Sequence, residues 1–332
     1  MSLRGGGSSR RHLHLAQVQV SNLLIFFFIL SSCAPLQTPQ SLLTIAPTVS
    51  ASIPTSTSTP IPVLLLLTNT PVICDPFTVD FCITDGHFLL QRPVKPPAND
   101  SVDSTYRYGS TANGTRDPHH GVEFVNKSGT PVYAAADGAV IFAGPDKEAI
   151  YSPWKNYYGN LVVIEHRNGL FTLYAHLSKI AIQTGQEVRA GDEIGEVGRT
   201  GVAIGSHLHF EVRQGDSQGY FATQNPELWL APNEDENGEL LGTLMISVID
   251  QRVGFQYAEF TMDYHPDRNQ PRLKTYYGTT YARDMMIGNE NAALSDLIPG
   301  EYRIALEYNG QLYERWVEVE SGKLTQVMLV VK

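Results

Sequence analysis

The sequence predicts a mainly β protein in which two β-rich regions follow an N-terminal export segment and a polar tether. From about residue 95 to 228, short runs of β-branched and aromatic residues alternate with turn-forming Gly, Asn and Asp. No stretch of this region keeps a helical period over ten residues. Beyond an acidic linker at 233–238, the strand pattern returns. These observations predict a β domain over 95–232 and a second one over 238–332.

Composition narrows the class of protein. A chain of 332 residues is long enough for roughly two domains, and 42% hydrophobic residues can fill real cores. The formal net charge is −10, and no run of Lys or Arg interrupts the body of the chain. Nucleic acid and anionic lipid surfaces are therefore disfavoured as main partners.

Residues 1–32 have the features of a signal peptide. Three arginines precede any acidic residue, and the apolar core at 23–30 is too short to span a bilayer as a helix. The core ends in Leu-Ser-Ser-Cys, which resembles a bacterial lipobox and predicts that Cys33 carries a lipid in an exported, membrane-anchored protein. An ordinary signal peptide with a chance Cys, or an uncleaved anchor, is the alternative.

Residues 33–94 form a Pro/Thr/Ser-rich tether followed by a lead-in segment. The tract from 34 to about 72 cannot bury enough apolar surface to fold, so we expect an extended tether that holds the folded part away from the membrane. Cys74 and Cys82 lie eight residues apart. Outside the cytoplasm they either close a small disulfide loop or remain as buried free thiols.

The first β-rich region contains three recognisable strand units. Two strands are expected within 130–142, around a turn at Asp137-Gly138. A hairpin is expected from 160–166 and 170–176, and another strand and turn from 185–195.

In the second region, strands are expected at 241–249, 302–308, 315–319 and 325–331, and regular turns between strands favour a small β-sandwich. It contains no cluster of catalytic residue types, which suggests a spacing or binding role, including binding of a protein partner. The residues expected to face its core are Ile246, Val248, Ile304, Leu306, Trp316, Val317, Val327 and Leu329.

Two short histidine motifs carry the chemistry. His119 and Glu123 lie four residues apart, so in extended chain both side chains point to one face. His207 and His209 share a face for the same reason, whereas His120 has the opposite parity and should point away. A facial set of His, carboxylate and His that leaves one position open for water is a catalytic zinc arrangement, whose chemistry is metal-assisted hydrolysis.

The stretch from about 117 to 226 resembles the lysostaphin-type (LytM-type) zinc peptidases, which cut peptide bonds in bacterial cell-wall peptidoglycan. The resemblance covers about a third of the chain. Its matching motifs lie at 119–124, 129–138, 158–160, 163–166, 172–178, 185–188, 194–195, 198–201, 205–212 and 225–226.

This resemblance implies a groove on an antiparallel β-sheet with the metal on its floor. It places the zinc ligands on His119, Glu123 and His209, and the two non-ligand active-site histidines on His176 and His207. Zinc lowers the pKa of bound water, and a nearby His can take up the proton or stabilise the oxyanion. The sequence assigns these two roles to His176 and His207 jointly.

One position departs from the family pattern, which usually has Asp where this chain has Glu123. Glu is a competent zinc ligand but is one methylene longer. The leading interpretation is an exported zinc endopeptidase that acts on peptidoglycan peptides. The alternative is a catalytically weak or inactive peptidoglycan-binding lipoprotein that activates other wall hydrolases.

Overall fold

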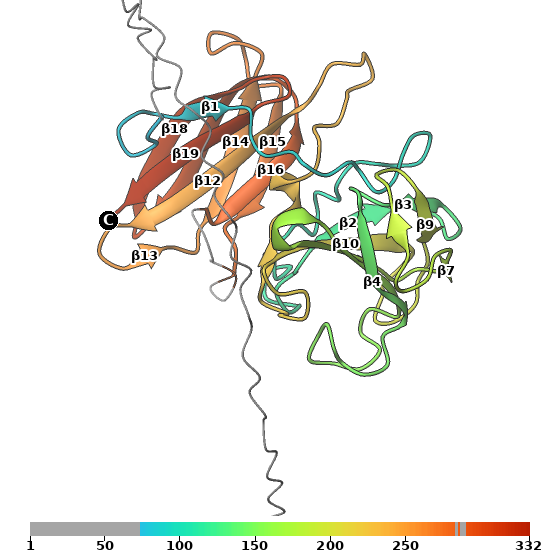
Figure 1. The fold of residues 1–332 in the computed structure, drawn as a ribbon. Coiled ribbons are helices and arrows are strands. Elements are labelled where there is room, and N and C mark those ends of the chain that lie inside the picture. The colour runs from blue at the N-terminus through green and yellow to red at the C-terminus, as the bar shows by residue number, and fades with distance from the viewer. Residues whose placement is uncertain (1–73, 283–284, 286–289) are drawn as a thin grey trace, which may run out of the picture. The chain divides into compact units, whose positions relative to one another are not determined.

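The computed structural model describes residues 74–282, 285 and 290–332 (Figure 1). The signal peptide expected over 1–32, the lipid attachment at Cys33 and the tether over 34–72 lie outside the described residues. Strands dominate the described part, where the helical elements include the short 3₁₀ turns η1 (Arg167–Gly169) and η2 (Pro226–Leu228). The prediction of a mainly β protein is confirmed. Among the described residues no helix is long and apolar enough to cross a membrane.

The first half is built on a seven-stranded antiparallel sheet, in the order β11-β10-β6-β5-β4-β8 with β2 also paired to β10. The predicted hairpin is confirmed as β5 and β6, joined through Asn168 and Gly169, which both have positive φ. The strands are β2 (Val122–Val125), β4 (Gly138–Pro145), β5 (Asn160–Glu165), β6 (Leu170–Ala175), β8 (Glu187–Val188), β10 (His207–Gln214) and β11 (Thr223–Gln224).

A small three-stranded sheet accompanies it, formed by β3 (Pro131–Tyr133), β9 (Glu193–Glu196) and β7 (Lys179–Ile180). Both strands expected around Asp137-Gly138 are present, but β3 pairs with β9 while β4 pairs with β5. The turn therefore reverses the chain between two sheets instead of closing a hairpin, because a turn signal sets a local change of direction and not the pairing partner.

Strand β10 has one face in the apolar core of this half, and its other face carries polar side chains. Leu208, Phe210 and Val212 are fully buried in the apolar cluster that fills the core. Because side chains alternate along a strand, His207 and His209 stand on the opposite face. The strand thus carries the candidate site directly over a packed apolar layer.

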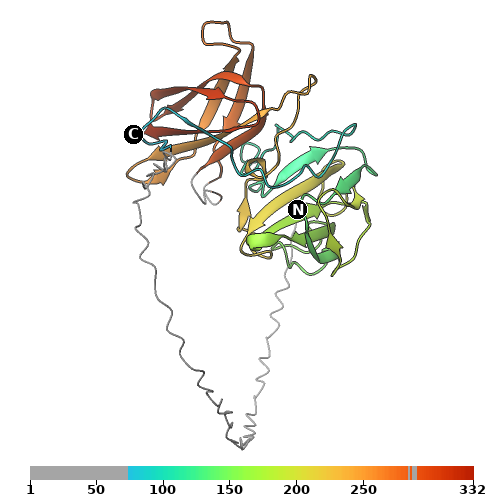
Figure 2. The same ribbon diagram turned by 45° about the horizontal axis from the view of Figure 1, so that its top comes forward.

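The second half is a β-sandwich, as predicted (Figure 1, Figure 2). One sheet has the order β1-β19-β12-β13, with β16 also on β12, and its β12–β19 pair is parallel. The other has the order β15-β14-β17-β18, and the two share one apolar core. The strands are β1 (Cys82–Thr84), β12 (Gly242–Asp250), β13 (Gly254–Phe255), β14 (Glu259–His265), β15 (Lys274–Thr279), β16 (Ala292–Leu297), β17 (Gly300–Tyr308), β18 (Gln311–Val319) and β19 (Leu324–Val331).

Seven of the eight residues expected to face the sandwich core are buried, and Trp316 is the exception. It is half-buried and packs its ring against His265, at 5.0 Å between centroids, with the Arg268 guanidinium 5.4 Å from the ring. Val317 is fully buried. Successive residues of a strand point to opposite faces, so both could not face the core.

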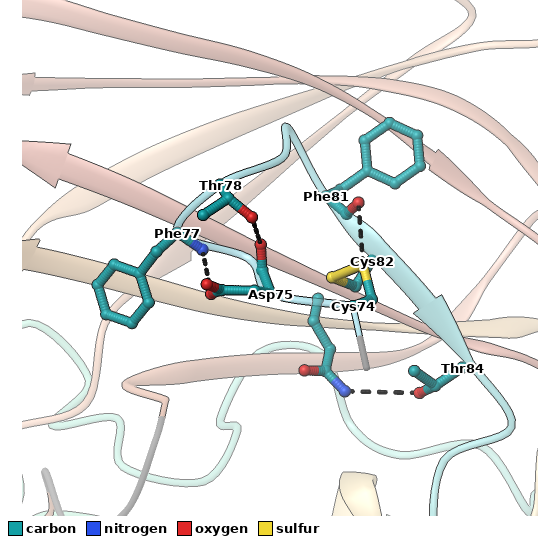
Figure 3. Close-up of a disulfide and its surroundings, with 8 residues drawn as sticks. Cys74, Asp75, Phe77, Thr78, Phe81, Cys82 and Thr84 are labelled. Atoms are coloured by element: carbon teal, nitrogen blue, oxygen red, sulfur yellow. Dashed lines mark hydrogen bonds between the residues drawn. A yellow bond between two sulfur atoms is a disulfide. The ribbon is translucent and has the colours of Figure 1, made fainter. Parts of the chain in front are cut away.

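The lead-in segment joins the sandwich. Strand β1 pairs with β19, with Cys82 opposite Gln326. Cys74 and Cys82 form a disulfide, shown in Figure 3, which decides between the two alternatives left open by the sequence. The disulfide closes a short loop whose Asp75 carboxylate accepts a hydrogen bond from the Phe77 backbone N–H.

Buried polar contacts join residues that precede the linker expected at 233–238 to residues that follow it. Glu227 is fully buried, forms an ion pair with Arg107, and accepts hydrogen bonds from the Ser295 backbone N–H and hydroxyl at 2.7 and 2.9 Å. Tyr281 packs within the apolar core of the first half, and Asn225 donates to its hydroxyl at 2.8 Å. The regions 95–232 and 238–332 are therefore connected by packing. We propose that they are two domains in the sense that each has its own function.

Candidate active site

The candidate site lies where β2 and β10 pair. In their antiparallel register Glu123 is directly opposite His209, which places the two side chains within contact range on one face. His119 precedes β2 in a loop that passes close to β10. A Cβ on Gly121 would lie 2.4 Å from the Phe210 carbonyl oxygen, so a glycine at this position permits the close approach.

Three potential ligand atoms converge there. One atom each from His119, Glu123 and His209 lies within 4.8 Å of the others. Nε2 of His119 is 3.1 Å from Nδ1 of His209 and 3.8 Å from Oε1 of Glu123. The structure therefore brings together the three residues that the sequence proposes as metal ligands.

The hydrogen bonds of the ring nitrogens of His119 and His209 that point away from each other identify the tautomers of the two rings. Nδ1 of His119 lies 2.9 Å from the Tyr106 carbonyl oxygen, which can only accept, so this nitrogen carries the proton. Nε2 of His209 lies 3.1 Å from a Glu211 carboxylate oxygen and carries the proton for the same reason. In the neutral forms that metal ligands require, the two nitrogens that face each other across 3.1 Å therefore both present lone pairs.

This arrangement fits a divalent metal. Two lone pairs and a carboxylate that face one another without a donor between them repel, whereas a cation between them satisfies all three. Two His and one carboxylate are a known catalytic zinc donor set. Burial, followed by the proximity of His209, holds the pKa of His119 well below its usual value, which keeps it in the neutral form a ligand requires.

A buried ion pair orients His209. Glu211 is fully buried and accepts hydrogen bonds from Tyr158 at 2.6 Å and from Arg213 at 2.7 and 2.9 Å, besides that from His209. Burial alone would raise the pKa of Glu211, but Arg213 and His209 outweigh it and hold the pKa below its usual value. The carboxylate therefore stays charged and fixes the His209 ring.

Glu211 lies within the motif at 205–212, and neither the motif spacing nor the resemblance assigns it a role. The signal was present, since positions 207, 209, 211 and 213 share one face of a strand and hold His, His, Glu and Arg.

The two predicted non-ligand histidines lie beside this set. Nδ1 of His176 is 2.9 Å from the Thr200 carbonyl oxygen. Nε2 of His207 is buried without a hydrogen-bond partner and lies 3.5 Å from Oε1 of Glu123. The rings of His176 and His207 are 5.0 Å apart.

Both of these histidines are neutral at physiological pH. Burial, followed by the neighbouring histidines, lowers the pKa of His176 to about 3, and burial and His209 lower the pKa of His207 to about 4. Nδ1 of His176 donates to the Thr200 carbonyl oxygen, so its Nε2 is unprotonated, and the unpartnered Nε2 of the neutral His207 ring is free to accept a proton. His176 has φ +62°, a conformation that is uncommon outside glycine and is often found at functional sites.

His120 lies outside the ligand set, although strand β2 begins only at Val122 and strand parity does not apply at this position. Its ring stacks on Tyr220 at 3.8 Å between centroids, and Nδ1 lies 3.3 Å from the Thr223 hydroxyl.

A pocket of about 300 Å³ adjoins the site and is lined in part by Glu123 and His207. It offers space for a substrate next to the candidate ligands.

Comparison with known proteins agrees with this geometry. Residues 117–220 match the model of Peptidase family M23. The chain is 40% identical over 119 residues to the peptidoglycan DD-endopeptidase ShyA of Vibrio cholerae, covering 33% of this chain and 26% of that protein. It is 46% identical over 95 residues to the DD-carboxypeptidase/endopeptidase Mpg of Neisseria meningitidis, covering 29% and 20%. The chain thus spans about a quarter or less of the length of these relatives.

Among solved structures, the chain is similar to a zinc-containing peptidase from Vibrio cholerae. The identity is 35%, the aligned part covers 38% of this chain and 37% of that one, and the TM-score is 0.33. The family match begins two residues before His119 and includes all the candidate ligands and both neighbouring histidines. Residues 117–220 of this chain are therefore a domain of Peptidase family M23.

Proposed function

We propose that this chain is a zinc-dependent endopeptidase that hydrolyses peptide bonds in bacterial peptidoglycan. The family match and the names of the two relatives support the reaction and the substrate class. The observation that carries the proposal is the convergence of His119 Nε2 and His209 Nδ1 with the Glu123 carboxylate. Three acceptors held together in this way are suited to a catalytic zinc and have no evident structural use.

In this proposal His119, Glu123 and His209 hold the zinc ion, which supplies a Lewis acid for hydrolysis at neutral pH. Nε2 of His207, unpartnered and close to Glu123, accepts the proton of the attacking water. His176 lies against His207 and shares in holding that proton or in stabilising the developing oxyanion. The proton then passes to the leaving amine.

The alternative function, a weak or inactive activator of other wall hydrolases, depends on Glu123 failing as a ligand. The contrary observation is that the longer carboxylate reaches the site, with Oε1 3.8 Å from His119 Nε2 and 3.5 Å from His207 Nε2. This reach favours the enzyme.

We further propose that the protein is exported and anchored to a membrane by lipid at Cys33. The Cys74–Cys82 disulfide supports an oxidising compartment, where such bonds persist. Cleavage would then act on the wall peptides within reach of the tether. For the sandwich we propose a binding role, with a wall component or a protein as its partner.

The test combines metal content with cleavage. The purified full chain is expected to bind one zinc and to cut a soluble cross-linked wall peptide, with the products identified by mass spectrometry. His209→Ala should lose both zinc and cleavage, whereas His120→Ala should retain both. Zinc content equal in the wild type and in His209→Ala would overturn the ligand assignment. A wild-type chain that binds zinc but cuts no wall peptide would favour the alternative function.

A further inference from the structure

The pocket beside the candidate ligands contains a cation that the proposed chemistry does not use. Of its lining residues, Glu123 and His207 belong to the candidate site. Arg116 is the one Lys or Arg among the lining residues that the structure describes. Arg116 is exposed and lines a pocket that opens beside the proposed reaction centre.

Arg116 is held there by stacking. Its guanidinium carbon lies 4.7 Å from the centre of the Tyr106 ring. Tyr106 in turn stacks on the ring of His119, with 4.1 Å between centroids and 13° between planes. Its hydroxyl donates to the Asp117 carbonyl oxygen at 3.1 Å. Guanidinium, phenol and imidazole thus form three layers that end on a candidate zinc ligand.

Stacking occupies the face of a guanidinium and leaves N–H groups at its edge for an acceptor. Within the described residues, no carboxylate lies within ion-pair distance of Arg116. The pocket holds two carboxylates of its own. Asp103 already accepts from the Thr105 backbone N–H and hydroxyl, both at 2.9 Å, and Glu123 belongs to the ligand set.

Arg116 also interacts with the Tyr106 hydroxyl, and no carboxylate of the described residues pairs with its remaining N–H groups. A guanidinium in this state matches a carboxylate, which it binds through two parallel hydrogen bonds. We propose that Arg116 binds a free carboxylate of the substrate close to the bond that is cut. The preferred substrates are therefore acidic peptides that carry this carboxylate, either on a side chain or at a chain terminus. Arg116 acts as a specificity-determining residue, and this inference rests on the proposed peptidase function.

The test compares matched peptides with the zinc-loaded full chain. One peptide keeps both carboxylates next to the cleaved bond, a second has the side-chain carboxylate as an amide, and a third has the terminal one as an amide. The wild type should lose about 10- to 100-fold in kcat/KM with the peptide that lacks the recognised carboxylate, the range expected for a charged hydrogen bond. The peptide that shows the loss identifies which carboxylate is bound.

In Arg116→Gln the ratio between acid and amide peptides should fall towards one, and Arg116→Lys should keep part of it because the charge remains while the fork is lost. Arg189→Gln is the matched control, since Arg189 is exposed and lies outside the pocket, and it should keep the wild-type ratio. A ratio that Arg116→Gln leaves unchanged, or a wild type that does not discriminate, would overturn the inference.

Binding measured by calorimetry separates this inference from the proposed function. If the zinc-loaded chain binds the acid peptide more tightly than its amide, and Arg116→Gln abolishes the difference, the inference stands even where no cleavage occurs. In that case the proposed hydrolysis fails and the carboxylate site does not. If the acid and amide peptides bind equally well, or neither binds, the carboxylate site is refuted whatever the cleavage result.

Discussion

Two buried polar clusters, one in the sandwich and one on β10, differ in how donors and acceptors are matched. In the sandwich Asn291 is fully buried, and its side-chain oxygen accepts from the Val248 N–H while its nitrogen donates to the Gln256 carbonyl oxygen. Asp263 likewise accepts from the Thr275 hydroxyl at 2.7 Å. Each contact joins a donor to an acceptor, as expected of polar groups that serve the fold.

On β10 the pairing of donors with acceptors changes from one end of the strand to the other. Glu211 is surrounded by donors, and this end of the strand resembles the sandwich. At His209 and its neighbours His119 and Glu123, acceptors face acceptors. The comparison teaches that burial of polar residues does not by itself mark a functional site, whereas a buried set of unmatched acceptors does.

The largest expected effect is on cleavage. His119→Ala removes one of the three unmatched acceptors and should lower zinc-dependent cleavage by more than about 100-fold. This exceeds the loss usually caused by replacing a residue that only hydrogen bonds to a metal ligand. His120→Ala, one residue along, removes a ring that stacks on Tyr220 and should leave most activity. Steady-state kinetics on a soluble wall peptide measures both. The reverse order would show that the motif is assigned in the wrong register.

At the end of β10 that holds Glu211 and Arg213, where donors match acceptors, a substitution should lower the stability of the fold. Arg213 is fully buried, and Arg213→Leu leaves the Glu211 carboxylate buried and short of its partner. We expect the free energy of unfolding to fall by about 3–5 kcal/mol. Arg272 pairs with Asp263 but its side chain is 57% exposed, so Arg272→Leu should cost less than about 1 kcal/mol.

Denaturant unfolding of the two variants measures this difference. Similar losses in both would mean that the buried network contributes no more than a surface ion pair.

The zinc-free chain should lose stability as the pH falls from about 6.5 towards 4. Burial depresses the folded-state pKa of His176 and His207 to about 3 and 4, so the unfolded chain takes up protons first. Stability is therefore full above the unfolded pKa near 6.5 and declines below it, by about 1.4 kcal/mol per pH unit for each His.

Unfolding of the zinc-free wild type at a series of pH values measures how steeply the free energy of unfolding depends on pH. His207→Gln should reduce this slope by the amount that corresponds to about one proton. A slope that His207→Gln does not change would contradict the buried neutral state.

The smallest expected effect concerns the length of the carboxylate. Glu123→Asp keeps the charge and should change zinc affinity by less than about tenfold, with a gain if the extra methylene strains the site. Glu123→Gln removes the charge and should weaken zinc binding by at least about tenfold, since a carboxylate is the stronger ligand. Competition titration with a chromogenic chelator gives both affinities. Unchanged affinity in Glu123→Gln would show that the side chain does not touch the metal.

Much of the fold could be predicted, because alternation and turn residues are local signals. The β5–β6 hairpin and the sandwich strands β12, β17, β18 and β19 follow from them, whereas β3 pairs with a strand far along the chain that no local signal identifies. Strands β14, β15 and β16 were not anticipated individually. Trp316 is hydrophobic but lies on the opposite face of β18 from Val317, so hydrophobicity without strand parity predicts its position wrongly.

Strand alternation, which predicts that His119 and Glu123 share a face, accounts for only part of the ligand set. Strand β2 begins at Val122, so His119 lies in the loop before it, and its position depends on the close passage at Gly121 instead of strand alternation. Tyr106 and Arg116 could not be placed from the sequence, because the loop that brings them to the site has no periodic pattern. The Glu211–Arg213 pair was visible in the parity of β10.

The most direct test of the unmatched acceptors is anomalous diffraction at the zinc edge from crystals of the full chain grown with zinc. The account predicts one peak between His119 and His209, with Nε2 of the first, Nδ1 of the second and a Glu123 oxygen each about 2.0–2.2 Å away. It also predicts that Nε2 of His209 stays hydrogen-bonded to Glu211. A peak bound by His120, a peak bound through Nε2 of His209, or no peak between these side chains would contradict it.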